Sequence, residues 1–200
     1  MNPKISIVVP FHWMAGWSYF LDRCLKSIES QTYKNYEVIL VKAGTMPVTS
    51  NRAIESARGE LVKIIYMDDY LAHPDSLKKI VEHFPKEAHW MATGCLHQIG
   101  DKTPGTGHLP EWNDSIQTGN NTIGSPSVIT LRRAGALFFD EKLSWLLDVD
   151  LYRRLYDTYG APVLLNDMNV VIGLHEGQTS NLMPQAAKLS EHEYLYKKYE

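Results

Sequence analysis

The sequence predicts an α/β protein whose central sheet is mostly parallel and flanked by helices. Strand-like and helix-like segments alternate three times before residue 85, which is the pattern of consecutive β-α units. Apolar residues make up 44% and charged residues 22% of the 200-residue chain, as in ordinary globular domains. This length is sufficient for one domain with a sizeable core.

Each of the first three strands is followed by a helix. Strand patterns rich in β-branched residues lie at residues 4–10, 36–44 and 61–67. Helix patterns lie at residues 16–33, 49–60 and 73–84. The second helix is expected to begin near Thr49 or Ser50, residue types that cap helices, and to stop at Gly59.

The second half of the chain is less regular. A strand pattern at residues 89–99 leads into a long loop rich in Gly, Pro, Asn and Thr, and such loops often form binding surfaces. Beyond it we predict a strand at 127–135, a helix at 143–160, one or two strands in 161–177 and a helix at 189–199. Leu189 and Leu195 are expected to pack this last helix on the body.

Composition excludes several classes of function. A net charge of −3 without a dense Lys/Arg stripe argues against a nucleic acid polymer as partner. The longest apolar runs are far shorter than the roughly 20 residues that cross a bilayer, so we expect no transmembrane segment. Two cysteines without metal-ligand spacing and an N-terminus without a secretory pattern favour a cytoplasmic protein.

The adjacent acids Asp68 and Asp69 stand where the third strand ends. Parallel sheets place their ligands at the carboxyl ends of the strands, so these carboxylates are candidates for binding a cation or a phosphate-bearing ligand. The alternative is structural, because Asp is frequent at turns and helix starts, where its side chain satisfies free N–H groups. Pattern alone favours the structural role.

Several segments together resemble family-two glycosyltransferases, which are inverting enzymes of the GT-A fold. The matching segments, in the family's order and spacing, are ISIVVPFH (5–12), FLDRCLKSIESQTYKNYEVILV (20–41), NRAIESARGELVKIIYMDDYLAHPDSL (51–77), IGSPSVITLRRAGALFFDEKL (123–143), LLDVDLYRRL (146–155) and, faintly, LHEGQTS (174–180). Each segment is weak alone, but their order makes the resemblance specific. It leaves out the loop from about residue 97 to 120.

The resemblance implies a GT-A-like three-layer sandwich forming a single domain over residues 1–200. Its nucleotide-sugar-binding half would be residues 1–96, its acceptor-side half 97–182 and its C-terminal helix 183–200. The implied activity transfers a hexosyl or N-acetylhexosaminyl group from a nucleotide-sugar donor to a glycan or lipid-linked saccharide acceptor. A peripheral position at the membrane is compatible with such an acceptor.

The resemblance also implies roles for individual residues. Asp148 aligns with the family's general base, and Asp68 with its last metal-contacting aspartate. His175 follows an apolar strand where the family can place a ligand of the metal or diphosphate, so Asp68 and His175 would hold Mn²⁺ or Mg²⁺. The expected donor-binding residues are Pro10, Phe11, His12, Lys42, Asn51, Arg52, Tyr66 and Asp68. The alternatives are a dipole role for Asp148 at its helix start and a plain surface position for His175.

Three departures from the family pattern keep another function open. Tyr66 replaces the first aspartate of the acidic motif, and Lys42 and Ala43 replace the acids after the second strand. The segment before Asn51 is also short, so a helix and a strand of the nucleotide-binding half are absent from the pattern. A homo-oligomer would cover apolar surface that this leaves open.

Two other functions compete with sugar transfer. The first is a catalytically degenerate protein that binds a nucleotide sugar or a glycan. The second is a sugar-phosphate nucleotidyltransferase, which would need a glycine-rich phosphate loop after the first strand, and residues 8–17 contain none. In the long loop, Trp112 either stacks on an acceptor sugar or, as is more common, plugs the loop.

Overall fold

The protein is described by a computed structural model that covers residues 4–200. The strands are β1 (Ile5–Pro10), β2 (Tyr36–Val41), β3 (Leu61–Ile64), β4 (Tyr70–Leu71), β5 (Trp90–Ile99), β6 (Gly107–His108), β7 (Ile129–Arg132) and β8 (Val163–Leu174). The helices are α1 (Trp17–Glu29), α2 (Met46–Glu55), α3 (Ser76–His83), α4 (Leu147–Tyr159), α5 (Thr179–Leu182) and α6 (Gln185–Tyr199), with short 3₁₀ turns η1 (Ile116–Thr118) and η2 (Pro126–Val128). The α/β prediction is confirmed.

The strands form one mixed, mostly parallel sheet. Their order is β2-β1-β3-β7-β5-β8-β4, with β6 paired to β5. β1 is parallel to both β2 and β3, and β5 is parallel to β8, whereas β7 runs antiparallel between β3 and β5. The carboxyl ends of β1, β2, β3, β5 and β8 therefore lie along one edge, which is where ligands bind in such sheets.

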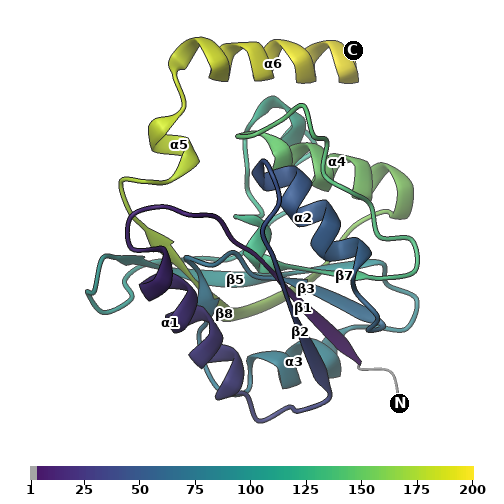
Figure 1. The fold of residues 1–200 in the computed structure, drawn as a ribbon. Coiled ribbons are helices and arrows are strands. Elements are labelled where there is room, and N and C mark those ends of the chain that lie inside the picture. Colours follow the sequence, from purple (N-terminus) through teal and green to yellow (C-terminus); the bar gives the residue numbers. More distant parts are fainter. Residues whose placement is uncertain (1–3) are drawn as a thin grey trace.

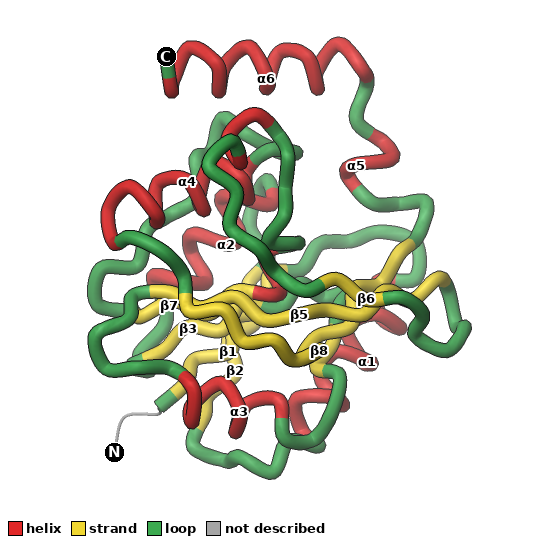
Figure 2. The backbone as a smooth tube through the Cα atoms, turned by 180° about the vertical axis from the view of Figure 1, so that it is seen from behind, coloured by secondary structure: helices red, strands yellow, loops and turns green. Residues whose placement is uncertain are grey.

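Helices cover both faces of the sheet and make three layers. Figures 1 and 2 show α1 and α3 on one face and α2 and α4 on the other. α6 lies outside the layer of α2 and α4 and is joined to β8 through α5 (Figure 1). Strands β1 and β3, which have neighbours on both sides and helices on both faces, are buried along their whole length. Such burial explains their continuous apolar sequence.

Several element boundaries differ from the sequence-based expectation. α2 begins at Met46, three residues before Thr49, because Pro47 suits a first turn. The Thr49 hydroxyl donates to the Thr45 carbonyl 2.9 Å away, inside the helix. β3 ends at Ile64, so Tyr66 already belongs to the loop that carries the acids.

The C-terminal helix packs differently from the prediction. Leu195 is buried as expected, but Leu189 is 53% exposed. The buried partner is instead a charged residue, Glu191. Where one or two strands were expected, a single 12-residue strand forms, β8. Within residues 4–200, every helix is too short or too polar to span a lipid bilayer.

Candidate active site

A cleft opens at the edge of the sheet where the parallel strands end. It has a volume of about 230 Å³ and is bordered by the segments that follow β1, β3 and β8, by the start of α4 and by the turn before β7. Asp68, Asp148 and His175, which are far apart in the sequence, all line it. The structure thus brings the three residues with implied chemical roles into one cavity.

Asp68 and His175 contact each other directly. The Asp68 Oδ2 and His175 Nε2 atoms are 3.0 Å apart, and their side chains are 21% and 14% exposed. The His175 ring stacks on Phe20 of α1, with centroids 4.8 Å apart. Arg23, one helical turn further along α1, donates from its guanidinium to the Asp68 carbonyl oxygen at 2.6 Å. Helix α1 therefore fixes both the side chain of His175 and the backbone of Asp68.

A glycine in β8 allows this close approach. A Cβ on Gly173 would collide with the Asp68 carbonyl oxygen, so only glycine lets the strand run against the acidic loop. The Gly173 N–H donates to Asp69 Oδ1 at 3.0 Å. Burial, followed by the nearby Asp68 charge, raises the pKa of the Asp69 carboxyl well above its usual range. Asp69 is thus a structural acid that joins its loop to β8.

The Asp68–His175 pair has a donor set that suits a divalent cation. A carboxylate oxygen and an imidazole nitrogen are both ligands of Mn²⁺, and Mg²⁺ is commonly held by one or two carboxylates together with substrate phosphates. Among residues 4–200 there is no group of three or more His, Cys, Asp or Glu residues that could hold a metal by itself. The pair therefore fits a cation only if oxygen atoms of a bound substrate complete the coordination.

Asp148 also lines the cleft, from the first turn of α4. Its Oδ2 accepts a hydrogen bond from the Asn121 side-chain amide at 2.7 Å, and its Oδ1 accepts from the Val149 N–H at 2.8 Å. Burial raises the pKa of the Asp148 carboxyl to about 7, although these hydrogen bonds oppose the rise. A carboxyl that exchanges its proton near neutral pH is suited to general base catalysis.

The expected donor-binding residues at the end of β1, and Tyr66 after β3, lie in or beside the cleft. Tyr66 and His12 line it, and burial raises the pKa of the Tyr66 hydroxyl above its usual value. Phe11 and His12 line a second cavity of about 220 Å³, which shares His12 and Met46 with the cleft. Pro10 is buried as the last residue of β1. This second cavity is the extension of the cleft toward the end of β2.

The remaining donor-binding predictions fall outside both cavities. Asn51 is buried in α2, where its side chain accepts from the Phe139 N–H and donates to the Phe139 carbonyl oxygen. Arg52 is exposed on the same helix. The Lys42 ammonium lies 4.1 Å from the centroid of the exposed Trp13 ring. The structure therefore gives Asn51 a role in holding the loop at residue 139 and leaves it out of the cleft.

Sequence reasoning missed several residues of the cleft. Trp145 and Ser125 line it, and Asn121 supports Asp148 from the long loop. The clue available for Trp145 was its position three residues before Asp148. Trp112 instead stacks on Tyr156 of α4, with centroids 4.0 Å apart, so it plugs the loop as the common alternative predicts.

The layered architecture is the GT-A fold, which solved structures of glycosyltransferases share. TarS of S. aureus in complex with UDP-GlcNAc has a TM-score of 0.65 and 18% identity, over 90% of this chain and 61% of that chain. Mannosyltransferase PcManGT from Pyrobaculum calidifontis, in complex with GDP-Man and Mn²⁺, has a TM-score of 0.61 and 14% identity, over 100% of this chain and 66% of that one.

The similarity to these proteins lies in the structure rather than in the amino-acid sequence. No protein-family model and no curated protein sequence matches the chain. The chain spans less than two thirds of the length of the two solved structures named above. At this level of identity, the comparison establishes the shared GT-A fold, and the resemblance of fold expected from the sequence is confirmed.

Proposed function

We propose that this chain forms a glycosyltransferase domain that moves a sugar from a nucleoside diphosphate sugar to a hydroxyl acceptor, with inversion at the anomeric carbon. The observation that carries the proposal is the convergence of Asp68, His175 and Asp148 on one cleft at the carboxyl edge of the sheet. The GT-A fold supports it, because the similar structures hold UDP-GlcNAc or GDP-Man.

In the proposed reaction, Asp148 acts as the general base. Its ionised carboxylate takes the proton of the acceptor hydroxyl while the acceptor oxygen forms a bond to the anomeric carbon. The bond from that carbon to the diphosphate oxygen breaks on the opposite face, and the electron pair leaves with the diphosphate. A single displacement of this kind inverts the anomeric configuration. The pKa of about 7 gives Asp148 both a substantial ionised fraction and useful basicity at neutral pH.

Asp68 and His175 are the proposed protein ligands of a Mn²⁺ or Mg²⁺ ion. Such an ion, when bound, neutralises the negative charge that develops on the diphosphate leaving group. The side chains of Asp68 and His175 are already in contact; Arg23 binds the backbone carbonyl oxygen of Asp68, and the Phe20 ring stacks on His175. His12 and Tyr66 are proposed to contact the donor from the same cleft.

The substrates are proposed by class only. A hexosyl or N-acetylhexosaminyl donor is supported by the ligands of the two similar structures, which are GDP-Man and UDP-GlcNAc. The proposed acceptor is a glycan or a lipid-linked saccharide that enters from the side of Asp148 and Trp145. Trp145 offers an aromatic face of the kind that packs against sugar rings.

A donor panel tests this function directly. Thermal unfolding is measured with UDP, GDP, UDP-GlcNAc and GDP-mannose, with and without Mn²⁺, and release of nucleoside diphosphate is then followed with water or added saccharides as acceptors. We expect Mn²⁺-dependent stabilisation by at least one donor and slow turnover that Asp148→Asn abolishes. Turnover unaffected by Asp148→Asn would contradict the assigned base.

A second candidate function is binding of a nucleotide sugar without catalysis. It is favoured by Tyr66 at the first position of the acidic motif and by the two-residue donor set for the cation. In the same panel it predicts Mn²⁺-dependent stabilisation with no diphosphate release for any donor and acceptor. The two functions are therefore separated by one series of measurements.

A further inference from the structure

The terminal helix α6 makes its most buried polar contact with the wall of the cleft. Glu191, which is only 9% exposed, accepts three hydrogen bonds from successive backbone N–H groups of the segment before α4. Ser144 donates to its Oε1 at 2.7 Å, and Trp145 and Leu146 donate to its Oε2 at 3.0 and 2.9 Å. A carboxylate held by a concave run of N–H groups is a strong, charge-assisted arrangement.

The segment held by Glu191 forms the wall that presents Asp148. Ser144 and Trp145 line the cleft, and Asp148 follows Leu146 by two residues. Leu146 is the residue that precedes α4, and its side chain makes no capping hydrogen bond to the helix. The start of α4 is therefore oriented through its backbone, by a carboxylate 45 residues further along the chain.

Other side chains of α6 hold Trp145 in the same wall. The His192 ring packs edge-on to the Trp145 ring, with centroids 5.3 Å apart. The Lys188 ammonium lies 5.0 Å from the centroid of the Trp145 ring. Lys188 and His192, which are near Glu191 on α6, thus contact the Trp145 side chain, while Glu191 binds the Trp145 backbone.

We propose that Glu191 is a positioning residue for the reaction, which fixes residues 144–146 and thereby the place of Asp148 in the cleft. This inference rests on the proposed function of Asp148 as the base. It assigns the terminal helix a part in the site, although α6 lies outside the three layers of the fold (Figure 1).

The charge of Glu191 adds an electrostatic consequence. The groups that face Asp148 are the Asn121 amide from the long loop, Tyr66 after β3, Tyr152 of α4 and Glu191 of α6. The Glu191 carboxylate raises the pKa of the Asp148 carboxyl, and burial is the larger cause of the rise. Removing that charge lowers the pKa of Asp148, and loosening of the fold would lower it too by hydrating the carboxyl. Amide exchange at residues 144–146 is therefore the readout that identifies the positioning role.

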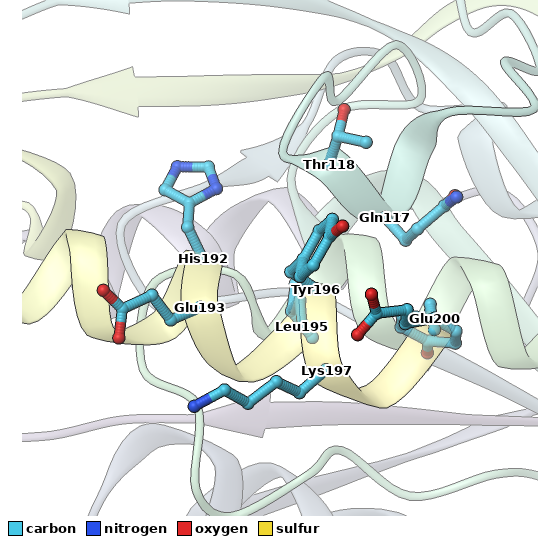
Figure 3. Close-up of a pocket in the computed structure, with 9 residues that line it drawn as sticks. Gln117, Thr118, His192, Glu193, Leu195, Tyr196, Lys197 and Glu200 are labelled. Atoms are coloured by element: carbon cyan, nitrogen blue, oxygen red, sulfur yellow. The ribbon is translucent and has the colours of Figure 1, made fainter.

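The first experiment compares Glu191→Gln with Glu193→Gln. Glu193 is on the same helix, is exposed, and lines the groove of about 500 Å³ between α6 and η1 (Figure 3). Hydrogen exchange of the amides of residues 144–146 and the ¹³C carboxyl titration of Asp148 are followed by NMR in the full chain. We expect Glu191→Gln to speed exchange at these amides about tenfold or more, since a charged hydrogen-bond acceptor is lost. The Asp148 titration is expected to move to lower pH.

The second experiment uses donor hydrolysis with Mn²⁺. Glu191→Gln is expected to lower kcat roughly tenfold with little change in KM for the donor, because small misplacement of a reacting group costs rate rather than binding. Its pH–rate inflection is expected to shift in the same direction as the Asp148 titration. Glu193→Gln is expected to match the wild type in every readout.

The outcomes separate this inference from the proposed function. If Asp148→Asn stops hydrolysis but Glu191→Gln behaves like Glu193→Gln, Glu191 has no positioning role and the function stands. If no variant hydrolyses any donor, the NMR readouts still decide whether Glu191 holds the segment and the charge state of Asp148. Unchanged exchange and titration in Glu191→Gln overturn the inference. Should that variant not fold, Glu191→Asp replaces it, and unchanged exchange at residues 144–146 is again the overturning result.

Discussion

The two carboxylates that line the cleft are both half-buried but are held by different partners. Asp68 is 21% exposed, follows a strand through a short loop and contacts the His175 ring nitrogen at 3.0 Å. Asp148 is held at a helix start by Asn121, and burial raises the pKa of its carboxyl. A cation site can remain open because substrate phosphates complete it, whereas a base must be held in place and desolvated by the protein itself. The difference supports the separate roles that we propose for two residues of the same type.

The largest expected effect separates those roles by kinetics. Asp148→Asn should lower kcat for transfer or donor hydrolysis by about 100-fold to 10,000-fold, the usual contribution of a general base, while donor affinity stays near that of the wild type. The measurement is steady-state diphosphate release together with isothermal titration of the donor in the presence of Mn²⁺. Asp157→Asn, an exposed acid on the same helix, is the matched control. A loss of donor affinity equal to the loss of rate would contradict the separate roles proposed for Asp148 and Asp68.

Asp68→Asn is expected to act on binding instead. Because changes even outside the ligand shell of a metal commonly cost about 10- to 100-fold in affinity, loss of this carboxylate should weaken Mn²⁺-dependent donor binding by at least that much. His175→Ala should produce a smaller loss of the same kind. Titration of UDP or GDP with and without Mn²⁺ measures both. If the wild type bound UDP and GDP equally well with and without Mn²⁺, the cation site would be contradicted.

The close contact at Gly173 offers a test of how closely the acidic loop must approach β8. Gly173→Ala is expected to destabilise the fold by about 1–3 kcal/mol, as overpacking does, because the added Cβ meets the Asp68 carbonyl oxygen. Gly105→Ala, where a Cβ would meet only the His97 carbonyl oxygen at 3.9 Å, is the control and should change stability by less than about 0.5 kcal/mol. Urea unfolding gives both values. Equal free energies of unfolding for the two variants would show that the loop at Asp68 moves away from an added Cβ without cost.

The smallest expected effect is a pH dependence of stability. The raised pKa of Asp148 means that the folded state retains this proton, whereas the unfolded state loses it near pH 3.8, so folded stability falls between about pH 4 and pH 7. Asp148→Asn does not titrate, and its Tm relative to wild type should rise by about 3 °C or more between pH 4 and pH 8. Scanning calorimetry at both pH values checks this. A constant difference in Tm would place Asp148 in a solvated environment.

The pattern of the sequence was sufficient for much of the fold. Alternation of apolar strands with amphipathic helices predicted the parallel arrangement of β1, β2 and β3, because these patterns reflect local periodicity and burial. The same reasoning placed Asp68 and His175 at strand ends on one edge. It did not predict the role of Asn51, whose side chain hydrogen-bonds the backbone of Phe139. A partner 88 positions away leaves no local signal in the sequence.

Charged residues inside the body show the same limit. Lys63 belongs to a strand and would be expected at a surface, yet it is fully buried and donates to the carbonyl oxygens of Ser127 and Ile129. Burial lowers its pKa to about 7. Glu191 is the corresponding case on α6. The burial of Lys63 and of Glu191 depends on which backbone groups of another segment are free to pair with them. Those groups are known only from the tertiary structure.

By itself, the sequence determined the order of strands and helices, the edge of the sheet that carries the acids and the identity of Asp148 and Asp68 as candidates. The elements and Asp68 follow from periodicity, from chain order and from residue types at the ends of strands, whereas Asp148 became a candidate through the family resemblance. Only the tertiary structure decided that Asp68 touches His175 and that the acid at 148 is desolvated. Contacts across about 100 residues depend on packing of complementary surfaces, and a pKa depends on the solvent that packing excludes.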